Sequence, residues 1–251
     1  IEELTANINN EDKKVALAIE KALPEINLLI KNIVDKLENG GRLFYLGAGS
    51  GGRLSVLDAI ELPTTYGIPK GKVNVILAGG VDRLIEAREE KEDDPNAGWE
   101  ALKGYEVSEN DFVLGISASG TTPFVLGALK SCRANGVLTG CIVSNPESPI
   151  AANADYPVEV LTGPEFVSGS TRMKCGTAQK MIFDMISTTS MIRLGRVEDN
   201  KMVNVLLIND KIVDRSVKML MERAEMSNYE EAKELLMEKG SVKSALESLG
   251  K

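Results

Sequence analysis

Two loops in this sequence are rich in glycine and hydroxyl side chains, and each lies between an apolar run and a helical pattern. They read GAGSGGR at residues 47–53 and SASGTT at residues 117–122. A helix N-terminus offers unpaired backbone N–H groups and a positive dipole end, which suit an anion, and hydroxyl side chains suit a sugar. The candidate substrate- or phosphate-binding residues are Gly49, Ser50, Gly51, Ser117, Ser119, Gly120, Thr121 and Thr122.

The composition of these loops favours one class of ligand. They carry many hydroxyl groups and few cations, which indicates a phosphate monoester on a neutral polyol. A nucleoside triphosphate would call for lysine and Mg²⁺. The alternative, that both loops are only tight β–α turns with good helix caps, remains open, although two such loops on one sheet weaken it.

A third segment with chemically useful side chains reads TGPEFVSGSTRMKCGTAQK at residues 162–180. Its cations could assist in binding an anion in an otherwise acidic protein. The candidates are Glu165, Ser170, Arg172 and Lys174. The alternative is a helix-capping segment whose cations lie on the surface.

The first loop also satisfies the dinucleotide fingerprint G-x-G-x-x-G, through Gly47, Gly49 and Gly52. That fingerprint needs an acidic residue at the end of the second strand to bind a ribose. Here the second strand ends in Ala78, Gly79 and Gly80, so a dinucleotide site is disfavoured.

Histidine is absent from the 251 residues. Imidazole bases, Ser-His-Asp triads and histidine-built metal sites are therefore excluded, and acid–base catalysis must use Glu, Asp, Lys, Tyr or Cys. The formal net charge of −8 argues against nucleic acid or an anionic membrane as partner. With no secretory or long apolar run, and with scattered cysteines at 132, 141 and 175, we expect a cytoplasmic protein.

Short apolar runs alternate with helical patterns through most of the chain. Strands are predicted within residues 41–49, 72–80, 111–120, 138–146 and 155–163, and helices within 53–62, 81–94, 123–136 and 177–195. This alternation predicts an α/β fold, a doubly wound parallel sheet sandwiched by helices, which binds ligands at the carboxyl ends of its strands.

Helical patterns also precede and follow this region. Residues 11–39 predict a helix that Pro24 interrupts and Gly40 ends. The charged pattern from Asp210 onward predicts a small helical appendage with a serine N-cap. We therefore expect two domains, residues 1–209 and 210–251.

Both ligand loops resemble those of sugar isomerase (SIS) phosphosugar-binding domains. More narrowly, residues 45–67 (YLGAGSGGRLSVLDAIELPTTYG), 117–129 (SASGTTPFVLGAL) and the stretch beginning GPEFVSGSTRMKCGTAQK at residue 163 resemble N-acetylmuramic acid 6-phosphate etherases, with the likeness running over residues 11–205. The resemblance implies a doubly wound homodimer without metal or cofactor that binds a small sugar phosphate. It implies cleavage of the substrate's lactyl ether, by elimination and then hydration, to N-acetylglucosamine 6-phosphate and D-lactate.

The resemblance implies that Glu61, in DAIELP, protonates the departing lactate oxygen and that Glu92, in EEKEDDP, is the base at C2. Pro63 predicts that the helix ends beside Glu61, where the negative end of the dipole would favour a protonated carboxyl group. Glu92 lies in an acidic run, which by itself is typical of a solvated face. Its catalytic role therefore depends on the resemblance.

The chain also departs from the family pattern. Ser50 and Gly51 stand where the family has Thr and Ser, and Thr121 stands where it has Arg. The residues around the acid differ as well, at Ile60, Leu62 and Thr64. These departures leave two alternatives open. One is a non-catalytic sugar-phosphate-binding regulator of the glucokinase regulatory protein type. The other is a diverged phosphosugar lyase or isomerase, the isomerase being disfavoured by the absence of histidine.

Overall fold

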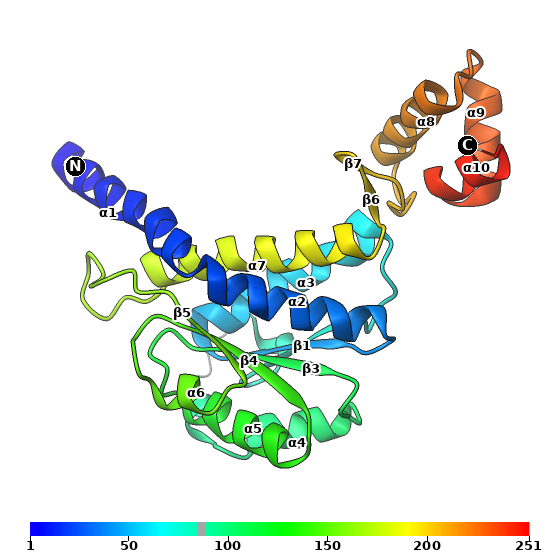
Figure 1. Cartoon of the computed structure of the whole chain (residues 1–251). Helices are drawn as coiled ribbons and strands as arrows, with labels where there is room; N and C mark the ends of the chain where they lie inside the picture. The colour runs from blue at the N-terminus through cyan, green and yellow to red at the C-terminus, as the bar shows by residue number, and fades with distance from the viewer. Residues whose placement is uncertain (85–88, 251) are drawn as a thin grey trace. The chain divides into compact units, whose positions relative to one another are not determined.

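The computed structural model describes residues 1–84 and 89–250 of the chain (Figure 1). Their internal contacts divide the chain into two compact units. The first comprises Ile1–Ala59 and Gly71–Ser190, and the second comprises Ile60–Lys70 and Met191–Lys251. The second unit thus begins before the boundary at residue 210 that the sequence predicts, and it includes a short segment from the middle of the chain.

A five-stranded parallel sheet forms the centre of the first unit. Its strands are β1 (Leu43–Gly47), β2 (Val73–Leu77), β3 (Phe112–Ile116), β4 (Leu138–Val143) and β5 (Tyr156–Glu159). They lie in the order β2-β1-β3-β4-β5, and all neighbours are parallel. The predicted doubly wound α/β fold is confirmed, and the order reverses between β1 and β3.

Helices cover both faces of this sheet, so that the five residues of β1 and the five of β3 are all buried. In Figure 1, α2, α3 and α7 lie over one face and α4, α5 and α6 over the other. Their bounds are α1 Glu2–Lys21, α2 Leu23–Glu38, α3 Gly49–Tyr66, α4 Ala97–Gly104, α5 Pro123–Ala134, α6 Pro149–Ala152 and α7 Lys174–Arg193. Phe44 and Leu46 of β1 pack with Leu102 of α4 and Leu129 of α5 in one apolar core.

The predicted break in the N-terminal helix is confirmed. Helix α1 ends at Lys21 and α2 begins at Leu23, with Pro24 in the first turn of α2. Proline is tolerated there because the first N–H groups of a helix have no partner within it.

The sequence predicts a helix at residues 81–94, and this prediction is wrong for the residues of that range that the structure describes. That part holds two short 3₁₀ helices, η1 (Val81–Arg83) and η2 (Glu89–Asp93), while residues 85–88 lie outside the described structure. The acidic run offers no apolar stripe to bury, and neighbouring like charges repel, so an α-helix there gains little. The α-helix begins instead at Ala97, where the Asp94 carboxylate accepts the backbone N–H of Asn96 at 2.9 Å.

The second unit is mainly helical. Its elements are the hairpin strands β6 (Val197–Glu198) and β7 (Lys201–Met202) and the helices α8 (Asp210–Ala224), α9 (Tyr229–Lys239) and α10 (Val242–Ser248). Side chains of Asn209, Asn228 and Ser241 cap the three helices. In the stretch that opens SNYEEAK at Ser227, the cap of α9 is therefore Asn228, and a serine caps only α10. Val217 and Leu236 belong to an apolar core that these helices share.

Pro63 predicts that helix α3 ends at Leu62. The helix instead continues to Tyr66, with Pro63 inside it. Partners within the second unit satisfy its last carbonyl groups. Thr64 accepts the backbone N–H of Leu206 at 3.2 Å, and the Arg196 guanidinium donates to the Gly67 carbonyl at 3.1 Å. Glu61 therefore precedes the last turn of the helix, and the prediction that the helix end, with its negative dipole, lies directly beside Glu61 is wrong.

A carboxyl group on α3 is held between elements of the first unit. Asp58 accepts hydrogen bonds from the hydroxyl groups of Tyr45 on β1, at 2.9 Å, and Ser187 on α7, at 2.8 Å. Burial raises the pKa of Asp58 from 3.8 to about 6, against the lowering effect of both hydrogen bonds. Burial also raises the pKa of Tyr45 well above its ordinary value.

Asp58 should make stability depend on pH. Its folded pKa lies above its unfolded value, so the folded chain binds the extra proton between about pH 4 and pH 6, and its contribution is lost as the pH rises through that window. We expect the unfolding free energy of the wild type, minus that of Asp58→Asn, to fall by up to about 3 kcal/mol between pH 4 and pH 7. Urea titrations at several pH values measure this difference, and a difference independent of pH would contradict the assignment.

Candidate functional site

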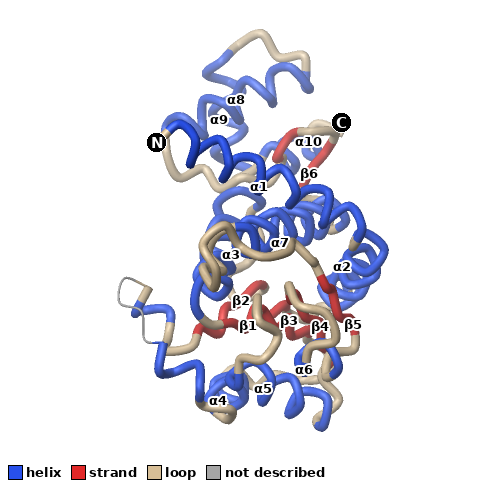
Figure 2. The backbone as a smooth tube through the Cα atoms, turned by 90° about the vertical axis from the view of Figure 1, so that its left-hand side faces the viewer, coloured by secondary structure: helices blue, strands red, loops and turns tan. Residues whose placement is uncertain are grey.

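A pocket of about 250 Å³ lies at the carboxyl ends of β1 and β3, where the strand order reverses. Open α/β sheets bind their ligands at such switch points. Figure 2 shows the two strands side by side at the centre of the sheet. The pocket is lined by Ala48, Gly49, Ser50, Gly51, Arg53, Glu92, Ile116, Ser117, Ala118, Ser119, Thr122, Thr171 and Gln179.

The first loop brings the start of α3 against the end of β1. Gly49 has φ +54°, a conformation that favours glycine, and it begins the helix. A Cβ on Gly52 would lie 2.5 Å from Leu77 Cδ1 and 2.9 Å from the Gly47 carbonyl carbon. The fingerprint glycines thus allow a tight turn and close packing of helix on strand. Gly49, Ser50 and Gly51 of the first turn of α3 line the pocket, and the first N–H groups of a helix have no partner within it.

The second loop is held in place by its own hydrogen bonds. Ser117 Oγ accepts the backbone N–H of Gly120 at 3.1 Å and lies 2.9 Å from Thr122 Oγ1. Gly120 has φ +75°, and a Cβ there would lie 2.3 Å from Ser148 Cβ. Asn145 donates to the backbone carbonyls of Ala118 and Ser119, both at 3.2 Å. This loop is therefore preorganised before any ligand arrives.

In the third segment, Glu165 and Lys174 interact with other parts of the chain. Glu165 accepts the backbone N–H groups of Lys174, at 2.9 Å, and Cys175, at 3.0 Å, so its carboxylate caps α7. Lys174 is 2% exposed, and its ammonium pairs with Glu11 of α1 at 2.7 Å. Hydrogen bonds from the ammonium groups of Lys14 and Lys174 lower the pKa of Glu11 to about 2.

The predicted binding residues thus fall into two groups. Gly49, Ser50, Gly51, Ser117, Ser119 and Thr122 line the pocket, and Glu92 lines it with them. The residues that do not line it are Gly120, Thr121, Glu165, Ser170, Arg172 and Lys174.

Six lining residues are not among the predicted binding residues: Ala48, Arg53, Ile116, Ala118, Thr171 and Gln179. Arg53 closes the first loop and Thr171 lies in the third segment, so both positions carried a usable signal. Gln179 is 2% exposed, and its Oε1 would lie 3.0 Å from a Cβ at Gly51, while Ile116 Cγ2 would lie 2.7 Å from it. Glycine at position 51 therefore lets Gln179 approach the loop. No local sequence pattern predicts this contact between Gln179 and the first loop.

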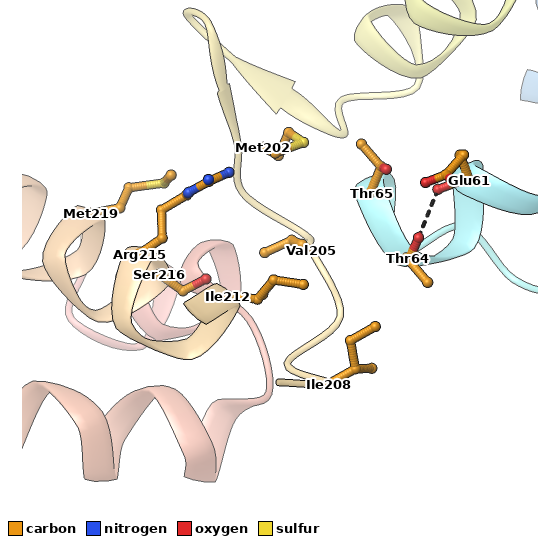
Figure 3. Close-up of a pocket in the computed structure, with 10 residues that line it drawn as sticks. All are labelled: Glu61, Thr64, Thr65, Met202, Val205, Ile208, Ile212, Arg215, Ser216 and Met219. Atoms are coloured by element: carbon orange, nitrogen blue, oxygen red, sulfur yellow. Dashed lines mark hydrogen bonds between the residues drawn. The ribbon is translucent and has the colours of Figure 1, made fainter. Parts of the chain in front are cut away.

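The two predicted catalytic glutamates line different pockets. Glu92, on η2, is partly buried in the pocket of the first unit. Glu61, on α3, lines a pocket of about 350 Å³ within the second unit (Figure 3). Each carboxylate thus lines a pocket within its own unit.

The pocket of the first unit combines groups that suit a phosphorylated polyol. It offers backbone N–H groups, several hydroxyls, the Arg53 guanidinium, the Gln179 carboxamide and one carboxylate, Glu92. In residues 1–84 and 89–250, no cluster of three or more Cys, Asp or Glu side chains is arranged to hold a metal ion. In those same residues no helix has the length and apolar character needed to cross a membrane.

Arg53 should supply the positive charge that a phosphate group needs. No ion pair in the described part of the chain includes it. We expect Arg53→Gln to weaken binding of N-acetylglucosamine 6-phosphate roughly 10-fold, since a charge-assisted hydrogen bond contributes about 1.5 kcal/mol or more. Arg172→Gln, which removes an exposed cation outside the pocket, is the matched control. Isothermal titration calorimetry measures both, and a larger loss in the control would contradict the assignment.

Comparisons with known proteins give a consistent result. The N-acetylmuramic acid 6-phosphate etherase of Bacteroides thetaiotaomicron is 52% identical over 99% of this chain and 89% of its own length. The etherase of Porphyromonas gingivalis is 54% identical over 98% of this chain and 90% of its own. The etherase of Lactococcus lactis subsp. lactis is 45% identical over 95% of this chain and 80% of its own length.

Family models and solved structures agree with these relatives. Residues 25–133 match the glucokinase regulatory protein N-terminal SIS domain, and residues 104–188 match the SIS domain. The solved structure of a protein from E. coli CFT073 has a TM-score of 0.59 at 19% identity, covering 78% of this chain and 92% of its own. Phosphoheptose isomerase from Neisseria gonorrhoeae has a TM-score of 0.58 at 14% identity, covering 75% and 97%. The fold is that of the SIS domain, and the chain belongs to the N-acetylmuramic acid 6-phosphate etherase family.

Proposed function

We propose that this chain is a carbon–oxygen lyase that cleaves the lactyl ether of N-acetylmuramic acid 6-phosphate, giving N-acetylglucosamine 6-phosphate and D-lactate. Relatives of this name match nearly the whole chain. The observation that carries the proposal is the position of Glu92, since a carboxylate lines the same pocket as both phosphate loops.

The two loops hold the phosphate and leave the sugar ring within reach of the base. Glu92 removes the C2 proton of the ring-opened sugar, which is acidified by the neighbouring carbonyl group. The C3–O bond then breaks, Glu61 gives its proton to the departing lactate oxygen, and a double bond forms between C2 and C3. Water returns a hydroxyl group to C3 and a proton to C2. No metal or cofactor takes part in this route.

Glu92 and Glu61 line pockets of different units, and elimination needs both carboxyl groups at one substrate. We propose that the enzyme is a homodimer in which the partner subunit contributes to each site. The family resemblance supports this arrangement.

The cytoplasm is the location that we propose for the enzyme. The three cysteines are buried and unpaired, as expected where thiols stay reduced.

The second candidate function is a regulator that binds sugar phosphates without cleaving them. The match of residues 25–133 to the glucokinase regulatory protein domain favours it, as does the loss of a family hydroxyl at Gly51. A regulator would need the phosphate loops and would have no use for acidic groups at Glu61 and Glu92.

Product analysis separates the two candidates. We expect the purified chain to release D-lactate from N-acetylmuramic acid 6-phosphate, and Glu61→Gln and Glu92→Gln each to slow release about 100- to 10,000-fold, as loss of a general acid or base does. Glu100→Gln, which changes an exposed carboxylate paired with Lys103, is the control and should retain activity. Binding without lactate release by the wild type would establish the regulator. Undiminished release by Glu92→Gln would contradict its role as the base.

A further inference from the structure

The pocket of the second unit has a chemical character of its own. Its volume is about 350 Å³, and one face of α8 and the last turns of α3 contribute to its lining. In Figure 3, Arg215 extends from α8 toward Met202, while Glu61 and Thr65 lie on the α3 side. The pocket therefore presents a guanidinium group and a carboxyl group from two different elements.

Both charged groups are available to a ligand. No ion pair in residues 1–84 and 89–250 includes Arg215 or Glu61, whereas neighbouring charges on α8 are paired, as in Lys218 with Asp214 at 2.7 Å. Thr64 Oγ1 donates to the backbone carbonyl of Glu61 at 3.0 Å, so this hydrogen bond does not involve the Glu61 carboxyl group. A free guanidinium in a pocket is suited to a carboxylate, which it binds through two parallel hydrogen bonds.

The rest of the lining is mostly apolar. Met202, Val205, Ile208, Ile212 and Met219 supply the apolar surface beside the guanidinium. Such a surface suits a small alkyl substituent. It does not suit a phosphate group, which is better satisfied by several N–H and hydroxyl donors, as in the pocket of the first unit.

We infer that this pocket binds the lactyl group of the substrate and the D-lactate formed from it, an inference that rests on the proposed function. Arg215 binds the lactyl carboxylate, and the apolar lining contacts its methyl group. Glu61, in the same pocket, faces the ether oxygen that it protonates. The second unit is thereby the part of the chain that distinguishes a lactyl ether from an unsubstituted sugar phosphate.

The test compares Arg215→Gln with Lys218→Gln in the full chain. Lys218 lies on the same helix, 70% exposed, and its loss removes a positive charge outside the pocket. We expect Arg215→Gln to lower kcat/KM for N-acetylmuramic acid 6-phosphate by roughly 10- to 100-fold and Lys218→Gln to leave it within about twofold. Arg215→Lys keeps the positive charge but loses the planar guanidinium that binds a carboxylate through two hydrogen bonds. Its kcat/KM should lie between those of Arg215→Gln and Lys218→Gln.

Affinity for N-acetylglucosamine 6-phosphate, which lacks the lactyl group, is the readout that a merely structural role would change. We expect it to stay within about twofold of the wild type in Arg215→Gln, because the phosphate loops are untouched. An equal loss for both ligands, or a wild-type kcat/KM in Arg215→Gln, would overturn the inference.

A wild-type chain that releases no lactate would refute the proposed function, and direct binding then decides the inference. Saturation-transfer NMR of D-lactate with the full chain should show transfer to the lactate methyl group. Transfer that Arg215→Gln abolishes and Lys218→Gln retains supports the site. Absence of transfer to the wild type, or equal transfer to Arg215→Gln, overturns it.

Discussion

The candidate site depends on one topological constraint, the reversal of strand order between β1 and β3. Strand β2 lies on one side of β1, and the remaining strands follow on the side of β3. Helix α3 therefore covers one face of the sheet, whereas α5 covers the other (Figure 1). The two loops must part at the carboxyl ends of these strands, and the crevice they leave has a helix N-terminus on each side.

This constraint explains why a glycine pattern typical of dinucleotide sites appears in a chain that lacks the acidic partner residue. Gly52 packs against Gly47 and Leu77 so closely that any side chain would collide with them. The need for glycine thus arises from the close approach of the helix to the strand. That approach is the same whichever ligand binds at this switch point. What selects the ligand is the set of polar groups around the glycines, here mainly hydroxyls with Arg53.

The parts that the sequence predicted well are those that local patterns determine. The parallel sheet follows from short apolar runs, and the two loops that line the pocket follow from glycines and hydroxyls at strand ends. Contacts between distant segments were not predictable. Lys174 pairs with Glu11, a residue 163 positions away, and α3 continues past Pro63 to an end where Leu206 and Arg196 donate to the carbonyls of Thr64 and Gly67. Gln179 reaches the first loop only because α7 packs there.

Both loops are proposed to hold one phosphate group, and every later step of the reaction depends on that placement. A crystal structure of the full chain with N-acetylglucosamine 6-phosphate tests it most directly. We expect a phosphate within hydrogen-bonding distance of backbone N–H groups or hydroxyls from residues 49–53 and from residues 117–122, with Arg53 beside it. A phosphate bound elsewhere, or touching only one of these loops, would contradict this placement.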